Sequence, residues 1–362
     1  MGPTTGSTAF SIERLEQRRL LCGALLDGAA GHAANGTLTT DAVDAPAESA
    51  GRNAEAGHVV AAFAQSNGGV RGGRVVWGEA AVIDGATVTT WAIVSKKDGR
   101  VMAAGATVPI SLAQNMPARG TGPAGAFASL DFPAVVRDTT YFNHLEMHSQ
   151  QNGHPAPPGS VNPDRNRVPH FDYHFYGVDE EKVRAIPPGP PVAQVPPDRL
   201  PAGYIQPGPS EAQMGRHSAP QWSVADPGPL STIVIAGYVP DASQMHFVEP
   251  MISREVLLEQ RDFTLNVPTP QTFDRDTLYP TRSEVVFQGG AHHFIYSDFM
   301  DTDPATPSGD AEPAYVPAPR QAAAGASGQA VTSADWLFAE GDEQDDGEED
   351  TDDGEHLADV VH

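Results

Sequence analysis

The chain has 362 residues and a formal net charge of −25, enough for two ordinary domains or one large domain with extensions. This charge excludes a basic nucleic-acid-binding face, and the single cysteine excludes a disulfide framework and a cysteine-rich zinc site. No apolar run approaches the ~18 residues of a transmembrane helix. Residues 335–362 hold 13 of the 47 Asp and Glu residues and no Lys or Arg, so about half of the charge belongs to an acidic tail.

Residues 1–57 have the features of a leader followed by a spacer. A basic stretch precedes the apolar run Leu20–Leu26, whose seven residues are the lower limit for the hydrophobic part of a secretory signal. The segment Leu15–Leu21 resembles the Leu-Glu-Pro-Arg-type leader of large exported proteins of some environmental bacteria, with Gln17 in place of the proline. The rest of the segment is small and polar, which favours a disordered spacer. We therefore expect export to the periplasm, the cell surface or the extracellular space; an ordinary amphipathic helix over residues 12–26 is the alternative.

Residues 58–135 are expected to form an antiparallel meander. Runs rich in Val, Ile, Thr and Ala alternate with glycine pairs and with Asp98-Gly99, which is typical of a tight two-residue hairpin turn. The predicted strands are 59–64, 75–82, 87–95 and 101–110, and a short helix is predicted over 109–114. No chemistry is visible in this stretch, so we interpret it as scaffold.

Residues 136–300 combine further strands with long proline-rich loops. Seventeen of the 33 prolines lie between Pro155 and Pro229, and the densest proline runs are incompatible with helices and central strands. The predicted strands are 168–176, 230–239, 245–248, 263–267 and 284–299, and Ser253 is predicted to cap a helix over 254–260.

The chain is therefore predicted to have one mainly β body over residues 58–300. We expect an antiparallel β-barrel or sandwich with few short helices and long proline-rich loops. Residues 301–334 are predicted to be a Pro/Ala/Gly linker, and residues 335–362 a disordered tail.

The segment Pro169–Tyr176 carries the sharpest candidate site. Side chains alternate faces along a strand, so His170, Asp172 and His174 share one face and the aromatic residues between them share the other. One face of the strand therefore carries titratable side chains, and the other face suits packing in a hydrophobic core. His170 and His174 are ~13 Å apart on a regular strand. One ion can therefore bind both histidines only if the strand is bulged; otherwise it binds one of them together with ligands from elsewhere.

Further candidate ligands lie outside this strand. His154 sits in a Pro/Gly loop, His217 follows the proline-rich excursion, and Glu249 ends an apolar strand. Imidazoles and carboxylates together suit zinc or another first-row transition metal. We expect metal ligands at His170, His174, His217 and His154, with Asp172 and Glu249 orienting a histidine or acting as base. A purely structural hydrogen-bonded cluster is the alternative.

Two other histidine pairs lie outside this candidate set. The alternating pattern His144-x-Glu146-x-His148 places three titratable groups on one strand face or within one helical turn. We expect them to be solvated; participation in the metal site is the alternative. His292 and His293 are adjacent, so on a strand they point to opposite faces, and we expect structural roles for both.

Several motifs occur in an order typical of one family. They are Pro169–Tyr176, Gly153-His154-Pro155, Pro201-x-Gly203-Tyr204, Met214-Gly215-x-His217, Glu249-Pro250-Met251 and Tyr279-Pro280-Thr281-Arg282. Over roughly residues 74–300 the chain thus resembles a small, largely uncharacterised family of exported bacterial β-rich proteins. A member of that family is controlled by an extracytoplasmic sigma factor and its anti-sigma partner and forms a ring. The resemblance implies export and a homo-oligomer but no enzymatic activity, and Ser218 stands where that family usually has an aromatic residue.

Three functions are consistent with these observations. The first is an exported β-rich protein that holds a divalent metal on the His170–His174 strand, for metal-dependent chemistry or ligand binding. The second is a non-catalytic, oligomeric envelope or stress-response protein whose histidines are structural. The third is a metal-free barrel that binds a small molecule.

Overall fold

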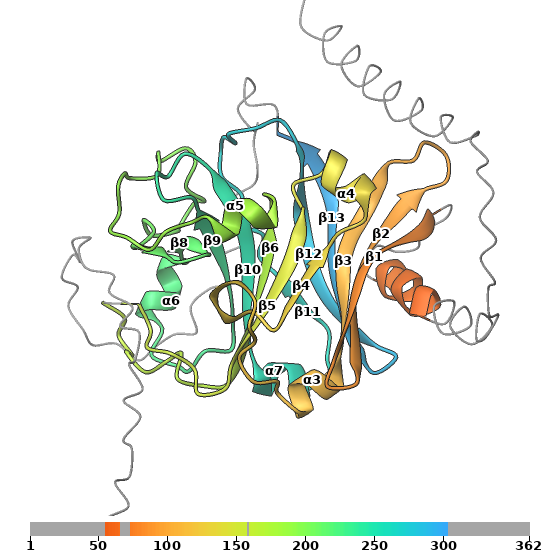
Figure 1. Cartoon of the computed structure of the whole chain (residues 1–362), viewed down its shortest axis with the longest axis horizontal. Coiled ribbons are helices and arrows are strands. Elements are labelled where there is room, and N and C mark those ends of the chain that lie inside the picture. The colour runs from red at the N-terminus through yellow and green to blue at the C-terminus, as the bar shows by residue number, and fades with distance from the viewer. Residues whose placement is uncertain (1–54, 66–72, 158, 303–362) are drawn as a thin grey trace, which may run out of the picture. The chain divides into compact units, whose positions relative to one another are not determined.

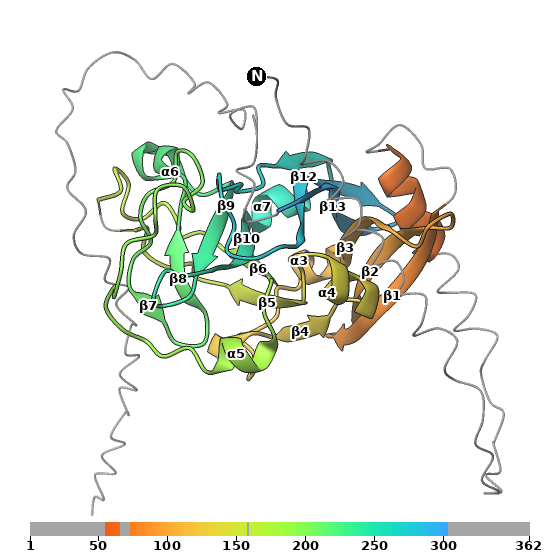
Figure 2. The ribbon, with the colours of Figure 1, turned by 90° about the horizontal axis from the view of Figure 1, so that it is seen from above.

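The computed structural model describes residues 55–65, 73–157 and 159–302, and the predicted leader, linker and acidic tail lie outside them. Within these residues, 13 strands form two antiparallel sheets, one of them curled into a half-barrel (Figures 1 and 2). The prediction of a mainly β, antiparallel body is confirmed. No helix among the described residues is long and apolar enough to span a membrane.

The first sheet has six strands and the second has seven. The order in the first sheet is β1 (Gly73–Ile83), β2 (Ala86–Ser95), β3 (Val101–Pro109), β13 (Ala291–Asp301), β12 (Leu278–Gln288) and β11 (Phe263–Leu265). The order in the second sheet is β4 (Ala128–Asp131), β5 (His144–Gln150), β6 (His170–Tyr176), β10 (Met245–Ser253), β9 (Thr232–Tyr238), β8 (Gly215–Ser218) and β7 (Ser210–Glu211).

Short helices connect the strands. They are α3 (Ile110–Gln114), the 3₁₀ helix η1 (Pro123–Gly125), α4 (Ala134–Thr139), α5 (Glu180–Arg184), α6 (Gln221–Ala225) and α7 (Arg254–Leu258). As predicted, Ser253 caps α7: its Oγ accepts a hydrogen bond from the Val256 amide.

The predicted meander is present as β1, β2 and β3, but its tight turn lies elsewhere. Asp84 and Gly85 have φ of 49° and 81° and connect β1 to β2 directly, which is the left-handed conformation that a two-residue hairpin requires. The loop from β2 to β3 is longer. The Ser95 amide donates a hydrogen bond to the Arg100 carbonyl across it. Gly99 has a φ of 72° there.

Two predicted strands were wrong. Residues 55–65 are helical, because Val59, Ala62 and Phe63 recur at helical spacing and bury one face against the first sheet. The predicted strand 284–299 is two strands, β12 and β13, joined at Gly289-Gly290, where both glycines have positive φ. Left-handed residues are favoured in two-residue hairpin turns because the twist of such turns matches that of the flanking strands.

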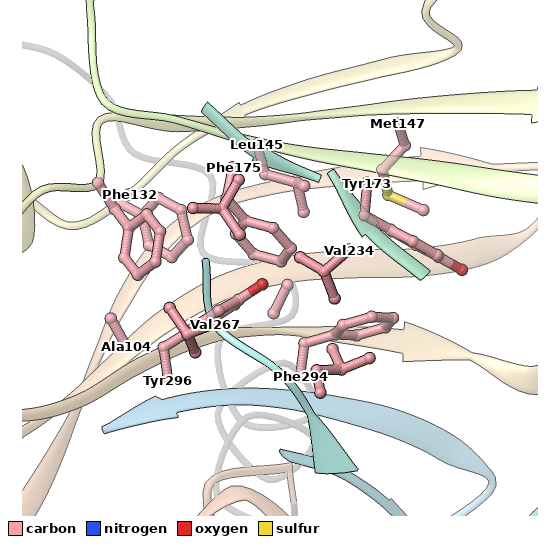
Figure 3. Packing of buried hydrophobic residues seen from close by; sticks show 14 of the residues in the cluster. Ala104, Phe132, Leu145, Met147, Tyr173, Phe175, Val234, Val267, Phe294 and Tyr296 are labelled. Atoms are coloured by element: carbon pink, nitrogen blue, oxygen red, sulfur yellow. The ribbon is translucent and has the colours of Figure 1, made fainter. Parts of the chain in front are cut away.

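The main core lies between the two sheets. Phe171, Tyr173 and Phe175 of β6 point into it, and the Tyr173 ring lies 4.5 Å from the ring of Phe294 on β13, centroid to centroid. Figure 3 shows Tyr173, Phe175 and Phe294 interleaved with Leu145, Val234 and Tyr296. The predicted alternation of β6 therefore holds: its odd-numbered residues fill the core, and its even-numbered residues are left for the opposite face.

Candidate metal centre

The face of the second sheet that points away from the core carries a row of titratable side chains. Glu146 of β5 stands opposite His174 of β6, and His148 stands opposite Asp172. Strand β10 pairs on the other side of β6. By strand alternation, this face holds His144, Glu146, His148, His170, Asp172, His174, Tyr176, Phe247, Glu249 and Met251, all of them buried.

His174, His217 and Glu249 form the first triad. One ligand atom from each lies within 4.8 Å of the others, with Glu249 Oε1 3.6 Å from His174 Nε2 and Glu249 Oε2 3.6 Å from His217 Nε2. The His174 and Glu249 side chains are 1% and 3% exposed. Both ring nitrogens of His174 and Oε2 of Glu249 have no hydrogen-bond partner. Buried polar atoms are nearly always partnered, and a shared cation would satisfy these atoms.

His154, His170 and Asp172 form the second triad. His170 Nε2 lies 3.4 Å from Asp172 Oδ1, and neither atom has a hydrogen-bond partner. The Nδ1 nitrogens of His170 and His154 lie 2.7 and 2.9 Å from the carbonyls of Val168 and Pro155. Because a carbonyl only accepts, Nδ1 carries the proton and Nε2 of the neutral ring keeps its lone pair. Metal-binding histidines are typically oriented in this way.

The separations in both triads suit a metal better than a hydrogen bond. The three His–carboxylate N···O distances are 3.4 to 3.6 Å, whereas a protein N–H···O bond is about 2.7–3.2 Å long. Two ligand atoms on one tetrahedral zinc ion, each about 2.0–2.2 Å from it, lie about 3.4 Å apart. The imidazoles and carboxylates are thus spaced for an ion between them.

Burial favours the uncharged forms of the first triad. It lowers the pKa of His174 well below its usual range, with the nearby His148 and His217 adding to the effect, and it lowers the pKa of His217 to about 4. Burial, and then the charges of Asp172 and Glu211, raise the pKa of Glu249 well above its usual range. The imidazoles are therefore free bases, the form that binds a metal, and binding of an ion there would require Glu249 to give up any proton that it carries.

Arg216 holds β8, and with it His217, in place. The Arg216 side chain is fully buried, and its guanidinium has no carboxylate partner among its hydrogen bonds. It donates instead to the backbone carbonyls of Gly208, Ala193, Pro240 and Pro207, at 2.9, 2.6, 3.4 and 2.9 Å. One side chain thus ties two parts of the proline-rich loops, and the connection between β9 and β10, to the strand that presents His217.

A missing side chain makes space beside the first triad. His217 stands opposite Gly237 in the sheet, and a Cβ at Gly237 would lie 2.0 Å from the Phe247 ring. That ring is 4.9 Å from the His174 ring and 5.1 Å from the His217 ring, centroid to centroid. Gly237 therefore lets the Phe247 ring pack against both imidazoles.

The prediction that His144, Glu146 and His148 are solvated was wrong. Their exposed fractions are 0%, 0% and 2%, and the two imidazole rings pack against Tyr176 and His174 of the neighbouring strand β6. The Glu146 carboxylate lies 3.6 Å from His144 Nε2 and 3.8 Å from His148 Nε2. His292 and His293, by contrast, make hydrogen bonds to the Leu257 and Gln288 carbonyls, in agreement with structural roles.

The structure separates the four predicted histidine ligands into two sets. His174 and His217 meet at Glu249, while His170 and His154 meet at Asp172. Asp172 and Glu249 each belong to a triad themselves, so they are placed to bind an ion directly rather than to orient a histidine from behind. What sequence reasoning missed is that β5 and β6 share one pattern, histidine, apolar, carboxylate, apolar, histidine; this repetition predicts two adjacent strands with one polar face.

Comparisons with known proteins identify no relative. No family model, no curated protein and no solved structure matches the chain. The resemblance to the exported, ring-forming family therefore stays a prediction, and the function has to be argued from the site.

Proposed function

We propose that this protein binds divalent transition-metal ions, zinc or another first-row metal, at the two triads. The observation that carries the proposal is the same in both: a buried imidazole nitrogen and a buried carboxylate oxygen face each other at 3.4–3.6 Å without a hydrogen bond. Each triad supplies two neutral nitrogen ligands and one anionic oxygen ligand, a set that suits these metals.

A structural role for the histidines is the main alternative. In that case the imidazoles and carboxylates would form charged or neutral hydrogen bonds, which are about 2.7–2.9 Å long when an ion takes part. The three distances exceed that range by half an ångström or more. A metal-free ligand-binding barrel would also leave these buried groups without partners, so metal binding is the better account.

Two histidines and one carboxylate leave one position of a tetrahedral ion open. Catalytic zinc sites use such three-ligand sets and place water or substrate in the fourth position. An ion at the first triad would be reached from the side of His217 and Glu211, whose side chains are 14% and 30% exposed. This supports metal-dependent chemistry or metal-assisted ligand binding at that edge.

Metal analysis of the purified full-length protein tests the proposal. We expect His174→Ala and Glu249→Gln each to lose the ion of the first triad, and His170→Ala and Asp172→Asn each to lose the ion of the second. His292→Gln serves as the matched control, because that histidine is buried in the other sheet. Absence of any transition metal, with none taken up after chelation and reloading, would contradict metal binding.

We also propose that the protein is exported, as an oligomer, on the basis of the leader motif and the family resemblance. Deletion of residues 1–28 should retain the protein in the cytoplasm, as measured by cell fractionation of the full-length and shortened chains. Equal retention of both chains would refute the leader prediction.

A further inference from the structure

The His217 ring lies between two carboxylates of unequal exposure. Its Nε2 faces Glu249 Oε2 at 3.6 Å, inside the first triad, and its Nδ1 faces Glu211 Oε1 at 3.8 Å on the other side. The Glu249 side chain is 3% exposed, whereas the Glu211 side chain is 30% exposed. Among the described residues, metal-sized groups of three ligand atoms include His217 only on its Glu249 side. An ion held by His217 therefore takes Nε2, and Nδ1 is left facing Glu211.

The Nδ1 nitrogen of His217 has to carry the ring proton once Nε2 binds an ion. A neutral imidazole has one proton, and the nitrogen that binds a metal uses its lone pair. In the second triad, the Nδ1 atoms of His154 and His170 face backbone carbonyls at 2.9 and 2.7 Å. The Nδ1 of His217 is buried and has no hydrogen-bond partner among the described residues. The Glu211 carboxylate is the acceptor that faces its proton.

The gap between Glu211 and His217 is small enough for a side-chain movement to close. A hydrogen bond between them would be about 2.8 Å long, so the 3.8 Å separation has to shrink by about 1 Å. Glu211 is partly exposed and ends β7, a two-residue strand at the edge of the second sheet. A metal on Nε2 withdraws electron density from the ring and makes Nδ1–H a stronger donor. Metal binding therefore favours closure of the gap.

Charge balance at the first triad calls for a second carboxylate. Two neutral imidazoles and the Glu249 carboxylate leave a divalent ion with one unit of positive charge, and a buried charge is costly unless it is paired. The charge of Glu211 acts at this place, because it contributes to the raised pKa of Glu249. A negative charge that disfavours a second carboxylate favours a cation at the same position.

We propose that Glu211 is the outer carboxylate of the first triad: it accepts the Nδ1 proton of His217 and balances the remaining charge of the ion. It is a positioning residue, which acts on the metal through the imidazole rather than by direct contact. Carboxylate, histidine and metal in this order fix the tautomer of the ring and raise its basicity as a ligand. The inference rests on the proposed metal binding at the first triad and names what orients and neutralises that site.

The Zn²⁺ affinity of the full-length protein, measured in competition with a chromophoric chelator, tests this proposal. His170→Ala is the parent, because it silences the second triad. We expect Glu211→Gln in this parent to weaken zinc binding about 10- to 100-fold. Glu181→Gln is the matched control, since it removes the same charge from an exposed position on α5, and it should bind zinc as the parent does. Equal affinities of the two variants would overturn the role of Glu211 alone, whereas a parent that binds no zinc would refute the first triad itself.

A second measurement needs no change at Glu211. In the zinc-loaded wild type, proton NMR should show the Nδ1–H resonance of His217 shifted downfield, because a proton shared with a carboxylate is deshielded; His217→Ala assigns the resonance by its loss. Glu211→Gln should move the resonance upfield, a change that a merely structural role of Glu211 would not produce. A zinc-loaded wild type whose His217 Nδ1 proton exchanges rapidly with water, without a downfield resonance, would overturn the proposal.

Discussion

Replacing Arg216 by methionine is expected to lower the free energy of unfolding by about 4 kcal/mol, since four backbone carbonyls, two of them in fully buried hydrogen bonds, would each lose a donor at about 1 kcal/mol. Methionine fills much of the same volume, so the loss would come mainly from the missing hydrogen bonds rather than from a cavity. Lysine should rescue little, because one ammonium group cannot reach carbonyls that a planar guanidinium contacts on several sides. Denaturant unfolding, followed by tryptophan fluorescence, measures the change.

The same variant also has a second readout at the metal centre. Loosening of β8 should displace His217 and weaken the first triad, while the ion of the second triad is retained. Arg254→Met is the matched control: Arg254 donates to two carbonyls, Ala113 and Gln114, and it is the first residue of α7, which does not carry His217. If Arg216→Met is as stable as Arg254→Met, the proposed role of Arg216 in holding β8 would be wrong.

Acid is expected to unfold this protein through its buried neutral histidines. Trp91 Nε1 donates to Thr107 Oγ1, and Thr107 Oγ1 lies 3.1 Å from His293 Nδ1. His293 Nε2 in turn lies 3.2 Å from the Gln288 carbonyl. This series of hydrogen bonds is complete when His293 Nε2 carries the only ring proton. Burial, opposed in part by the Gln288 bond, lowers the pKa of His293 to about 4, and it lowers the pKa of His246 to about 4 as well.

The sign of the pH dependence follows from these pKa values. Above the unfolded-state pKa of about 6.5 both states are neutral and the stability is unaffected. Between pH 6.5 and 4 only the unfolded chain takes up the proton, so stability falls with decreasing pH, by about 3 kcal/mol for each such histidine. Below pH 4 the loss levels off. Unfolding free energies measured with chelator present, from pH 8 to 4, should show this decline.

His293→Gln isolates one histidine from the total. Glutamine keeps a donor for the Gln288 carbonyl but does not titrate. We therefore expect His293→Gln to be somewhat less stable than the wild type at pH 7, and to lose about 3 kcal/mol less than the wild type between pH 6.5 and 4. Parallel curves for the two proteins would show that His293 is not a source of the acid sensitivity.

Much of the strand pattern was predictable from the sequence, because it depends on local alternation and capping. The face assignment of β6 and the cap of α7 by Ser253 needed only neighbouring residues. The helix over 55–65 was missed because its apolar residues also suit a strand. The turn at Gly289-Gly290 was missed because the apolar residues on both sides read as one continuous strand.

The candidate site was less predictable, because it depends on register and curvature. Nothing local in the sequence places His217 beside His174 rather than His170; that pairing arises from the order of β6, β10, β9 and β8 in the sheet. The burial of the β5 histidines likewise depends on the neighbouring strand β6. A pattern search alone predicts the residue types of the site, whereas its division into two triads requires the assembled sheet.

The first triad also has a mechanical consequence. His174, His217 and Glu249 belong to β6, β8 and β10. An ion shared by them would be a cross-link that closes chain loops of about forty and about thirty residues. Closure of long loops is the kind that removes most conformational entropy from the unfolded chain. With a single cysteine, this chain has no intramolecular disulfide to do so. The bound metal would then keep the proline-rich loops attached to the sheet. Removal of the metal would release these loops before the core itself unfolds.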